Sequence, residues 1–200
     1  MRLVTGLWLG LLVLPLTRCD RRPEPATAQS PSGSFTPDST RLAQLTAFRE
    51  GTAEVHELQG GYPSREELVR GFLQALEAQD TASLRHLAID RAEFGWIYYP
   101  TNPQARPPYD LDPSMLWFMT SQHSAKGLGK ALAAVAGKRL QYAGHSCDST
   151  VSHEGENTVY GPCLVRLVQA PGDTAQVRMF SLVIERHGRW KIVSYANKLD

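Results

Sequence analysis

Apolar residues repeat at helical spacing in the first half of the chain, behind a pattern that marks a helix start. Ser64-Arg65-Glu66-Glu67 has the form of a capping box, in which a serine and a glutamate three residues later satisfy backbone amides reciprocally. The apolar positions that follow share one helical face: Leu68, Val69, Phe72, Leu73 and Leu76. Asp80 is placed to cap a second helix that carries Leu84 and Leu87.

Other stretches carry weaker helical patterns. A preliminary helix is predicted over residues 41–50, and two more over residues 112–122 and 124–136. Residues 94–113 are rich in aromatic side chains and proline, which predicts irregular structure there.

The last third of the chain changes to the pattern of strands. Runs rich in Val, Ile, Leu and Phe are separated by turns at Pro171-Gly172-Asp173 and His187-Gly188. A two-residue loop at His187-Gly188 pairs Glu185 with Trp190. Both faces of this hairpin are apolar, so one packs against helices and the other needs inserted segments or a second copy of the chain to cover it. Helices followed by strands predict an α+β fold, with N-terminal helices packed on an antiparallel sheet.

The first nineteen residues have the pattern of an export signal. Arg2 precedes an apolar run over residues 3–16, which is too short to cross roughly 30 Å of hydrocarbon as a helix. Leu16-Thr17-Arg18-Cys19 resembles a bacterial lipoprotein signal, which implies that Cys19 becomes the lipidated first residue. The alternatives are cleavage after Ala26-Thr27-Ala28 and an uncleaved anchor. We therefore expect an exported protein of the bacterial cell envelope, periplasmic or on the outer face, held at a membrane by lipid or anchor.

Composition divides the remaining chain into a tether and a domain. Residues 20–40 are dominated by Pro, Ser, Thr, Ala and Gly, which predicts a disordered tether. Residues 41–200 are enough for a single domain with one core. The net charge is +1, and the domain contains no Lys/Arg run, which argues against nucleic acid as a partner.

Two cysteines follow Cys19, an even pair in an exported domain. The strands predicted over residues 139–151 and 158–168 form a hairpin symmetric about Gly155, which places Cys147 opposite Cys163 and favours a disulfide. The alternative is a metal site, in which His145 and His153 would join the two cysteines. The sequence lacks the close Cys-x-x-Cys spacing typical of such sites, so we expect no metal.

Two stretches resemble the nuclear transport factor 2-like superfamily. Phe72-Leu73-Gln74-Ala75-Leu76-Glu77-Ala78-Gln79-Asp80 is similar to the family's first helix and the step into its second. Glu185-Arg186-His187-Gly188-Arg189-Trp190-Lys191-Ile192 is similar to its closing hairpin. The resemblance covers residues 64–199 and implies a cone in which a curved antiparallel sheet cradles helices. Members include isomerases, dehydratases, cyclases, pocket binders and noncatalytic dimer modules, so the fold alone does not define an activity.

Enzymes of this superfamily place an Asp, His or Tyr inside the cone, and the weak candidates here are Asp110, Asp112 and His123. The structural interpretation is that the aspartates are loop or cap residues and that His123 ends a helix. An apolar ligand pocket is predicted from aromatic residues of the same part of the chain: Trp96, Tyr98, Tyr99 and Trp117. The final hairpin also gathers Arg186, Arg189 and Lys191, which is typical of a solvated sheet edge or an anion site.

Two function classes remain. We favour a noncatalytic envelope protein whose cone binds a small apolar ligand or a partner protein, without a cofactor and with a homodimer through the sheet as one arrangement. The alternative is a cofactor-free acid-base enzyme of the isomerase, dehydratase or cyclase type. A buried carboxylate or histidine facing an enclosed cavity favours the enzyme.

Overall fold

The computed structural model describes residues 38–148 and 151–199. By its internal contacts the chain divides into residues 1–34 and 35–200, and the description that follows concerns the second unit. The leader, Cys19 and most of the predicted tether lie outside the described residues. The first described helix begins at Asp38, three residues before Arg41, the first residue of the predicted domain. Within the described part of the chain, no helix is both long enough and apolar enough to cross a membrane.

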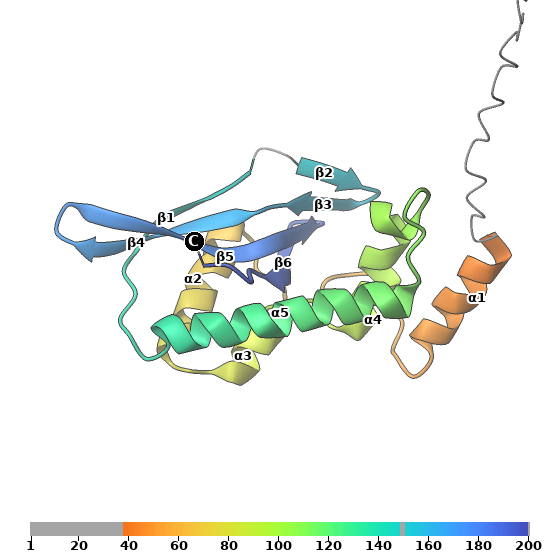
Figure 1. The fold of residues 1–200 in the computed structure, drawn as a ribbon, viewed down its shortest axis with the longest axis horizontal. Coiled ribbons are helices and arrows are strands. Elements are labelled where there is room, and N and C mark those ends of the chain that lie inside the picture. The colour runs from red at the N-terminus through yellow and green to blue at the C-terminus, as the bar shows by residue number, and fades with distance from the viewer. Residues whose placement is uncertain (1–37, 149–150, 200) are drawn as a thin grey trace, which may run out of the picture. The chain divides into compact units, whose positions relative to one another are not determined.

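The fold is α+β, as predicted (Figure 1). The helices are α1 (Asp38–Arg49), α2 (Arg65–Glu77), α3 (Thr81–His86), α4 (Arg91–Glu93) and α5 (Pro113–Val135). Shorter turns follow α4: a π-helical turn η1 (Phe94–Tyr98) and 3-10 turns η2 (Tyr99–Thr101) and η3 (Pro103–Ala105). The strands are β1 (Tyr142–Cys147), β2 (Val151–Glu154), β3 (Asn157–Tyr160), β4 (Cys163–Ala170), β5 (Asp173–Arg186) and β6 (Arg189–Tyr195).

The six strands form one antiparallel sheet in the order β1-β4-β5-β3-β2, with β6 also pairing to β5. The predicted pairing of Glu185 with Trp190 is confirmed. The outer edge of β6 is not free. Tyr62 and Trp190 exchange backbone hydrogen bonds of 3.0 and 2.8 Å, and the Ile89 amide donates to the Ile192 carbonyl at 2.8 Å. The loops before and after the α2–α3 pair therefore cover an edge that could otherwise pair with another chain.

The β5–β6 hairpin is covered on both faces. Phe180, Val183, Ile192 and Tyr195 belong to one buried cluster with the apolar side chains of α2 and α3. Ile184 and Val193 belong to a second cluster, with Phe94, Ile97 and other residues of η1 and its flanks. Helix α5 contributes to both clusters, since Leu116 lies in the second and Leu128 in the first. The second apolar face predicted from the sequence is thus covered by segments of the same chain.

Ser64 and Asp80 cap α2 and α3, as predicted, but the Ser64 capping box is not reciprocal, because Glu67 Oε1 accepts from the Ser64 hydroxyl at 3.3 Å rather than from the Ser64 amide. The Ser64 hydroxyl accepts a hydrogen bond from the Glu67 amide at 3.1 Å, and an Asp80 carboxylate oxygen accepts one from the Ser83 amide at 3.0 Å. Two other predictions are wrong. Residues 113–135 form one helix rather than two, so His123 lies within α5 instead of ending a helix. Much of residues 94–113 is not irregular, because a capping box from Asp90 to Glu93 starts helical turns that continue to Ala105.

The predicted disulfide is confirmed. Cys147 and Cys163 are bonded, and they lie directly opposite each other in the β1–β4 pairing. The hairpin around Gly155 is present but interrupted: β2 and β3 continue it, and β3 then pairs with β5. The bond spans a sequence separation of 16. A loop of that length contributes about 3 kcal/mol of stability in the chain-entropy model.

A buried ion pair connects the helical turns to the sheet. The Lys191 ammonium donates to Glu93 Oε2 at 2.7 Å, and the two side chains are 5% and 0% exposed. The Asp90 amide donates to the same oxygen at 2.9 Å, and the Gln59 amide donates to Glu93 Oε1 at 2.7 Å. The interpretation of Lys191 as part of a solvated sheet edge is therefore wrong.

Breaking this pair on one side should destabilise the fold strongly. Lys191→Met leaves the Glu93 carboxylate buried and unpaired, and such changes cost about 3 to 5 kcal/mol. Arg70→Met is the matched control, since its pair with Glu66 has side chains that are 56% and 54% exposed, and an exposed pair is worth about 0 to 1 kcal/mol. Urea unfolding gives both values. The stabilising role of the Glu93–Lys191 pair would be refuted if Lys191→Met lost no more stability than Arg70→Met. It would also be refuted if Glu93→Gln, introduced into Lys191→Met, did not restore part of the lost stability.

Candidate functional site

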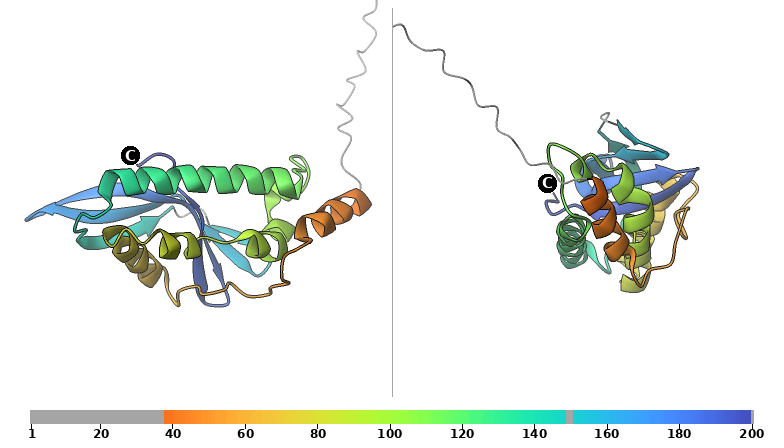
Figure 2. Two further views of the ribbon diagram at one scale, coloured as in Figure 1. Left: turned by 90° about the horizontal axis from the view of Figure 1, so that it is seen from below. Right: turned by 90° about the vertical axis from the view of Figure 1, so that its right-hand side faces the viewer.

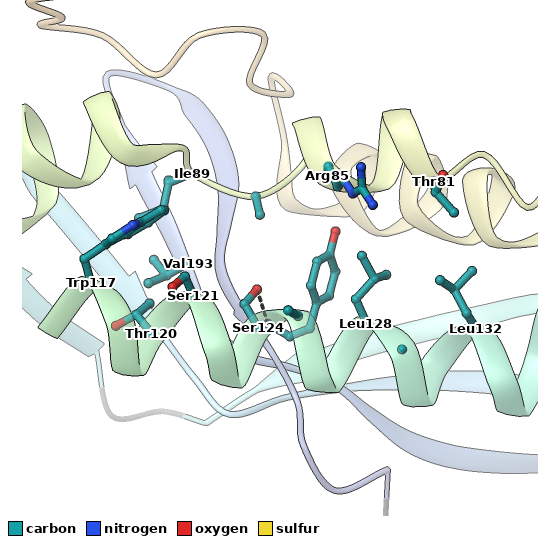
Figure 3. Close-up of a pocket in the computed structure, with 14 residues that line it drawn as sticks. Thr81, Arg85, Ile89, Trp117, Thr120, Ser121, Ser124, Leu128, Leu132 and Val193 are labelled. Carbon is teal, nitrogen blue, oxygen red and sulfur yellow. Dashed lines mark hydrogen bonds between the residues drawn. The ribbon is translucent and has the colours of Figure 1, made fainter. Parts of the chain in front are cut away.

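A cleft of about 360 Å³ lies between α3 and α5, above the end of β6 (Figure 3). The wall on α5 consists of Trp117, Thr120, Ser121, Ser124, Ala125, Leu128, Gly129 and Leu132. The opposite wall and the floor consist of Thr81, Arg85, Ala88, Ile89, Val193 and Tyr195. The cleft thus runs along α5 from Trp117 to Leu132, which is about 22 Å at 1.5 Å per residue.

The positions of the two walls follow from two close contacts. At Gly127, a Cβ atom would lie 2.7 Å from the Ala196 carbonyl oxygen, so only glycine lets the α5 backbone approach the end of β6 this closely. On the other side, the Tyr195 hydroxyl donates a hydrogen bond to the Leu84 carbonyl of α3. Several side chains of the lining are small, including Ser121, Ala125 and Ala88, and this leaves space unfilled.

The cleft combines apolar ends with polar groups between them. In Figure 3, Trp117, Ile89 and Val193 lie at one end, and Leu128 and Leu132 lie toward the other. Hydroxyl groups of α5 line the wall between these ends, where Ser124 Oγ accepts a hydrogen bond of 3.4 Å from the Tyr195 amide. This arrangement is typical of sites that hold a small, mostly apolar molecule and orient it by a few polar contacts.

The described residues that line the cleft include no Asp, Glu, His, Cys or Lys. Among the described residues that line it, only Arg85 and Tyr195 are ionisable. Arg85 carries the single positive charge on its rim. Burial raises the pKa of Tyr195 far above the neutral range, and its hydroxyl already donates to Leu84. A general base needs a group that accepts a proton near neutral pH, and the described lining holds no carboxylate or imidazole for that role.

Only one of the four predicted pocket aromatics, Trp117, lines the cleft. Trp96 lies under Arg49, whose guanidinium carbon is 3.9 Å from the ring centroid, and its indole nitrogen donates to Thr52 Oγ1 at 3.2 Å. Tyr98 and Tyr99 are buried in the second cluster. Burial, with the nearby charge of Glu154, raises the pKa of Tyr98. These aromatic residues fill or border the second cluster and do not line the cleft.

The three weak catalytic candidates do not converge. Asp110 accepts a hydrogen bond from Arg41 Nε at 3.1 Å and is paired with that guanidinium. Asp112 caps α5, with one oxygen accepting from the Ser114 amide at 2.8 Å and the Met115 amide at 3.2 Å. His123 is exposed on α5. None of the three lines the cleft.

Two titratable groups that the sequence analysis did not connect with acid-base chemistry are partly or fully buried. Glu154 is 8% exposed, and burial raises its pKa, although Ser152 donates to its Oε1 at 2.9 Å. No described residue bonds to its other oxygen. Alternation along the hairpin could have indicated that Glu154 points inward, but its place beside a turn resembles an ordinary solvated position. It does not line the cleft.

The second group is His145. Arg65 Nε donates to His145 Nε2 at 2.9 Å, so that nitrogen has no proton, and Nδ1 lies 2.6 Å from the Tyr142 hydroxyl. Burial, followed by the charge of Arg65, lowers the pKa of His145 and keeps the ring neutral. This histidine is therefore a fixed structural acceptor, and it too lies outside the cleft.

The structure also bears on the metal alternative. Cys147 and Cys163 are bonded to each other and so have no thiolate to offer a metal ion. Over residues 38–148 and 151–199, no group of three or more His, Cys, Asp or Glu side chains is arranged to hold one.

No protein-family model, curated protein or solved structure matches this chain. The function must therefore be argued from the chemistry of the site.

Replacing the buried Glu154 carboxylate should stabilise the protein in a pH-dependent way. Because its folded-state pKa is raised, ionised Glu154 is unfavourable in the fold at neutral pH, and that penalty disappears as the pH falls through the raised pKa. Glu154→Gln should thus raise the melting temperature at pH 7, with a gain that shrinks as the solution is acidified. Glu50→Gln, at an exposed position, is the control and should show no such trend. A gain for Glu154→Gln that is absent at pH 7, or that grows on acidification, would contradict the prediction.

Proposed function

We propose that the protein is a noncatalytic, exported protein of the bacterial cell envelope that binds a small apolar ligand in the cleft between α3, α5 and β6. The observation that carries this proposal is the cleft itself: about 360 Å³ of space lined by apolar and hydroxyl side chains, without an Asp, Glu or His among its described lining residues. Such a lining favours binding over acid-base chemistry.

The arginine at the rim of the cleft favours a ligand that carries an acidic group. Arg85 belongs to the last turn of α3 and borders the cleft together with Thr81. An apolar molecule with one acidic group could place its body along Leu128 and Leu132 while that group meets the guanidinium. A carboxylate, sulfonate or phosphate accepts charge-assisted hydrogen bonds from arginine.

The proposal also includes export to the cell envelope and membership of the nuclear transport factor 2-like superfamily. The apolar run and Cys19 support export and attachment to a membrane, with residues 20–37 as the tether. The nuclear transport factor 2-like resemblance gains support from helices that lie along an antiparallel sheet, with α5 and the α2–α3 pair side by side (Figure 2). The enzyme alternative has less support, because its candidate residues lie outside the cleft.

Filling the cleft should weaken binding of an amphipathic probe. We would titrate the purified full-length protein with 1-anilinonaphthalene-8-sulfonate, an apolar fluorophore with an anionic group. Ala125→Phe places a ring over the cleft wall and should reduce the affinity strongly, and Arg85→Gln should reduce it less by removing the charge.

Ala133→Phe is the matched control, since Ala133 is exposed on the same helix and does not line the cleft. Far-ultraviolet circular dichroism should show that all variants are folded. Equal affinities for Ala125→Phe and Ala133→Phe would refute the cleft as the binding site.

A further inference from the structure

The outer face of α5 exposes a cluster of large apolar side chains. Met115, Phe118 and Met119 are 53%, 60% and 39% exposed. Their spacing of three and four residues places them on one side of the helix, away from Trp117 and Ser124. We call these three residues the α5 patch. Large apolar side chains gathered on one surface are unusual for a soluble monomer and indicate a contact with another apolar phase or protein.

Further along α5, the side of the helix that carries the α5 patch exposes lysines. Beyond the patch, Lys126 and Lys130 are exposed on this side of the helix, and the Lys130 ammonium also donates a hydrogen bond to the Asn197 carbonyl. Helix α5 contains no Asp or Glu between Pro113 and Val135. An apolar patch beside lysines, on a helix that is not apolar enough to cross a membrane, is the pattern of helices that lie in the surface of an anionic bilayer.

The place where the preceding chain joins the domain favours the same partner. The sequence has 37 residues before Asp38, including the apolar run over residues 3–16 and Cys19. Helix α1 follows directly, and it packs against the part of α5 that carries the patch, since Leu45 and Leu116 share a cluster. Figure 2 shows α1 at the end of the domain where α5 begins. Leu42 of α1 is 64% exposed as well.

We propose that the α5 patch rests on the surface of an anionic lipid bilayer, with Lys126 and Lys130 facing its headgroups. Side chains of an interfacial helix reach about 5 to 10 Å into the boundary between headgroups and acyl chains, which suits Phe118 and the two methionines. A membrane attachment at the N-terminal end of the chain would bring this end of the domain to the bilayer. This contribution of the N-terminal attachment rests on the proposed function. The exposed α5 patch and its lysines do not depend on it.

The contact can be tested with a tryptophan placed in the patch. Full-length protein carrying Phe118→Trp would be reconstituted into phosphatidylethanolamine–phosphatidylglycerol vesicles, with either ordinary or brominated acyl chains. Val168→Trp is the control, because Val168 is a 36% exposed apolar residue of β4, away from α1 and α5. The tryptophan emission of the unsubstituted protein is measured in the same vesicles and subtracted, because the chain already contains other tryptophans. We expect brominated lipid to remove most of the added emission of Phe118→Trp and to leave that of Val168→Trp unchanged.

A second pair of variants tests the charge. Lys126→Gln with Lys130→Gln should reduce the quenching of Phe118→Trp, with little effect from Lys138→Gln, which lies beyond the end of α5. Equal quenching at positions 118 and 168 would overturn the proposal. So would a stable dimer in lipid-free solution that Phe118→Ser dissociates, because a second copy of the chain would then be the occupant. Quenching at position 118 in a chain that carries no lipid at Cys19 would support the bilayer contact and refute the proposed attachment.

Discussion

The buried pair of Glu93 and Lys191 is the interaction on which the arrangement of this domain depends. Glu93 holds two backbone amides and the Lys191 ammonium with its two carboxylate oxygens, and both Glu93 and Lys191 are buried. The pair therefore fixes the loop before α2 and the start of the helical turns against β6 at one point. A protein in which a buried charge pair is replaced by apolar residues is often no less stable than the original. What the pair supplies here is position: it sets how the 91–105 segment covers the second face of the sheet.

Much of the fold could be predicted because its signals are local. The caps at Ser64 and Asp80, the loop at His187-Gly188 and the opposition of Cys147 and Cys163 each depend on residues close in sequence or on hairpin symmetry. Lys191 could not be placed in this way, because its partner is 98 residues away and lysine in a hairpin ordinarily faces water. The segment after Asp90 was also missed, since its aromatic and proline residues resemble a loop until tertiary packing selects helical turns.

The site was harder to predict for a related physical reason. Large aromatic residues predict a pocket from the sequence, yet such residues also fill space, and Tyr98 and Tyr99 do so in the core. The cleft lies where side chains are small and where the α5 backbone at Gly127 approaches the backbone of Tyr195 and Ala196 closely. The buried carboxylate of Glu154 and the ring of His145 bond to other residues of the domain and do not line the cleft.

The most direct measurement is native mass spectrometry of the full-length protein, extracted with mild detergent from the membranes of cells that express it. We predict a chain that begins at Cys19 with attached lipid and carries, in addition, a small noncovalently bound molecule. The bound molecule should be missing from Ala125→Phe and retained by Ala133→Phe. A protein that carries no bound molecule, or one whose occupancy is the same in both variants, would contradict a ligand-binding cleft. An unmodified chain that starts after Ala28 would contradict the lipid attachment.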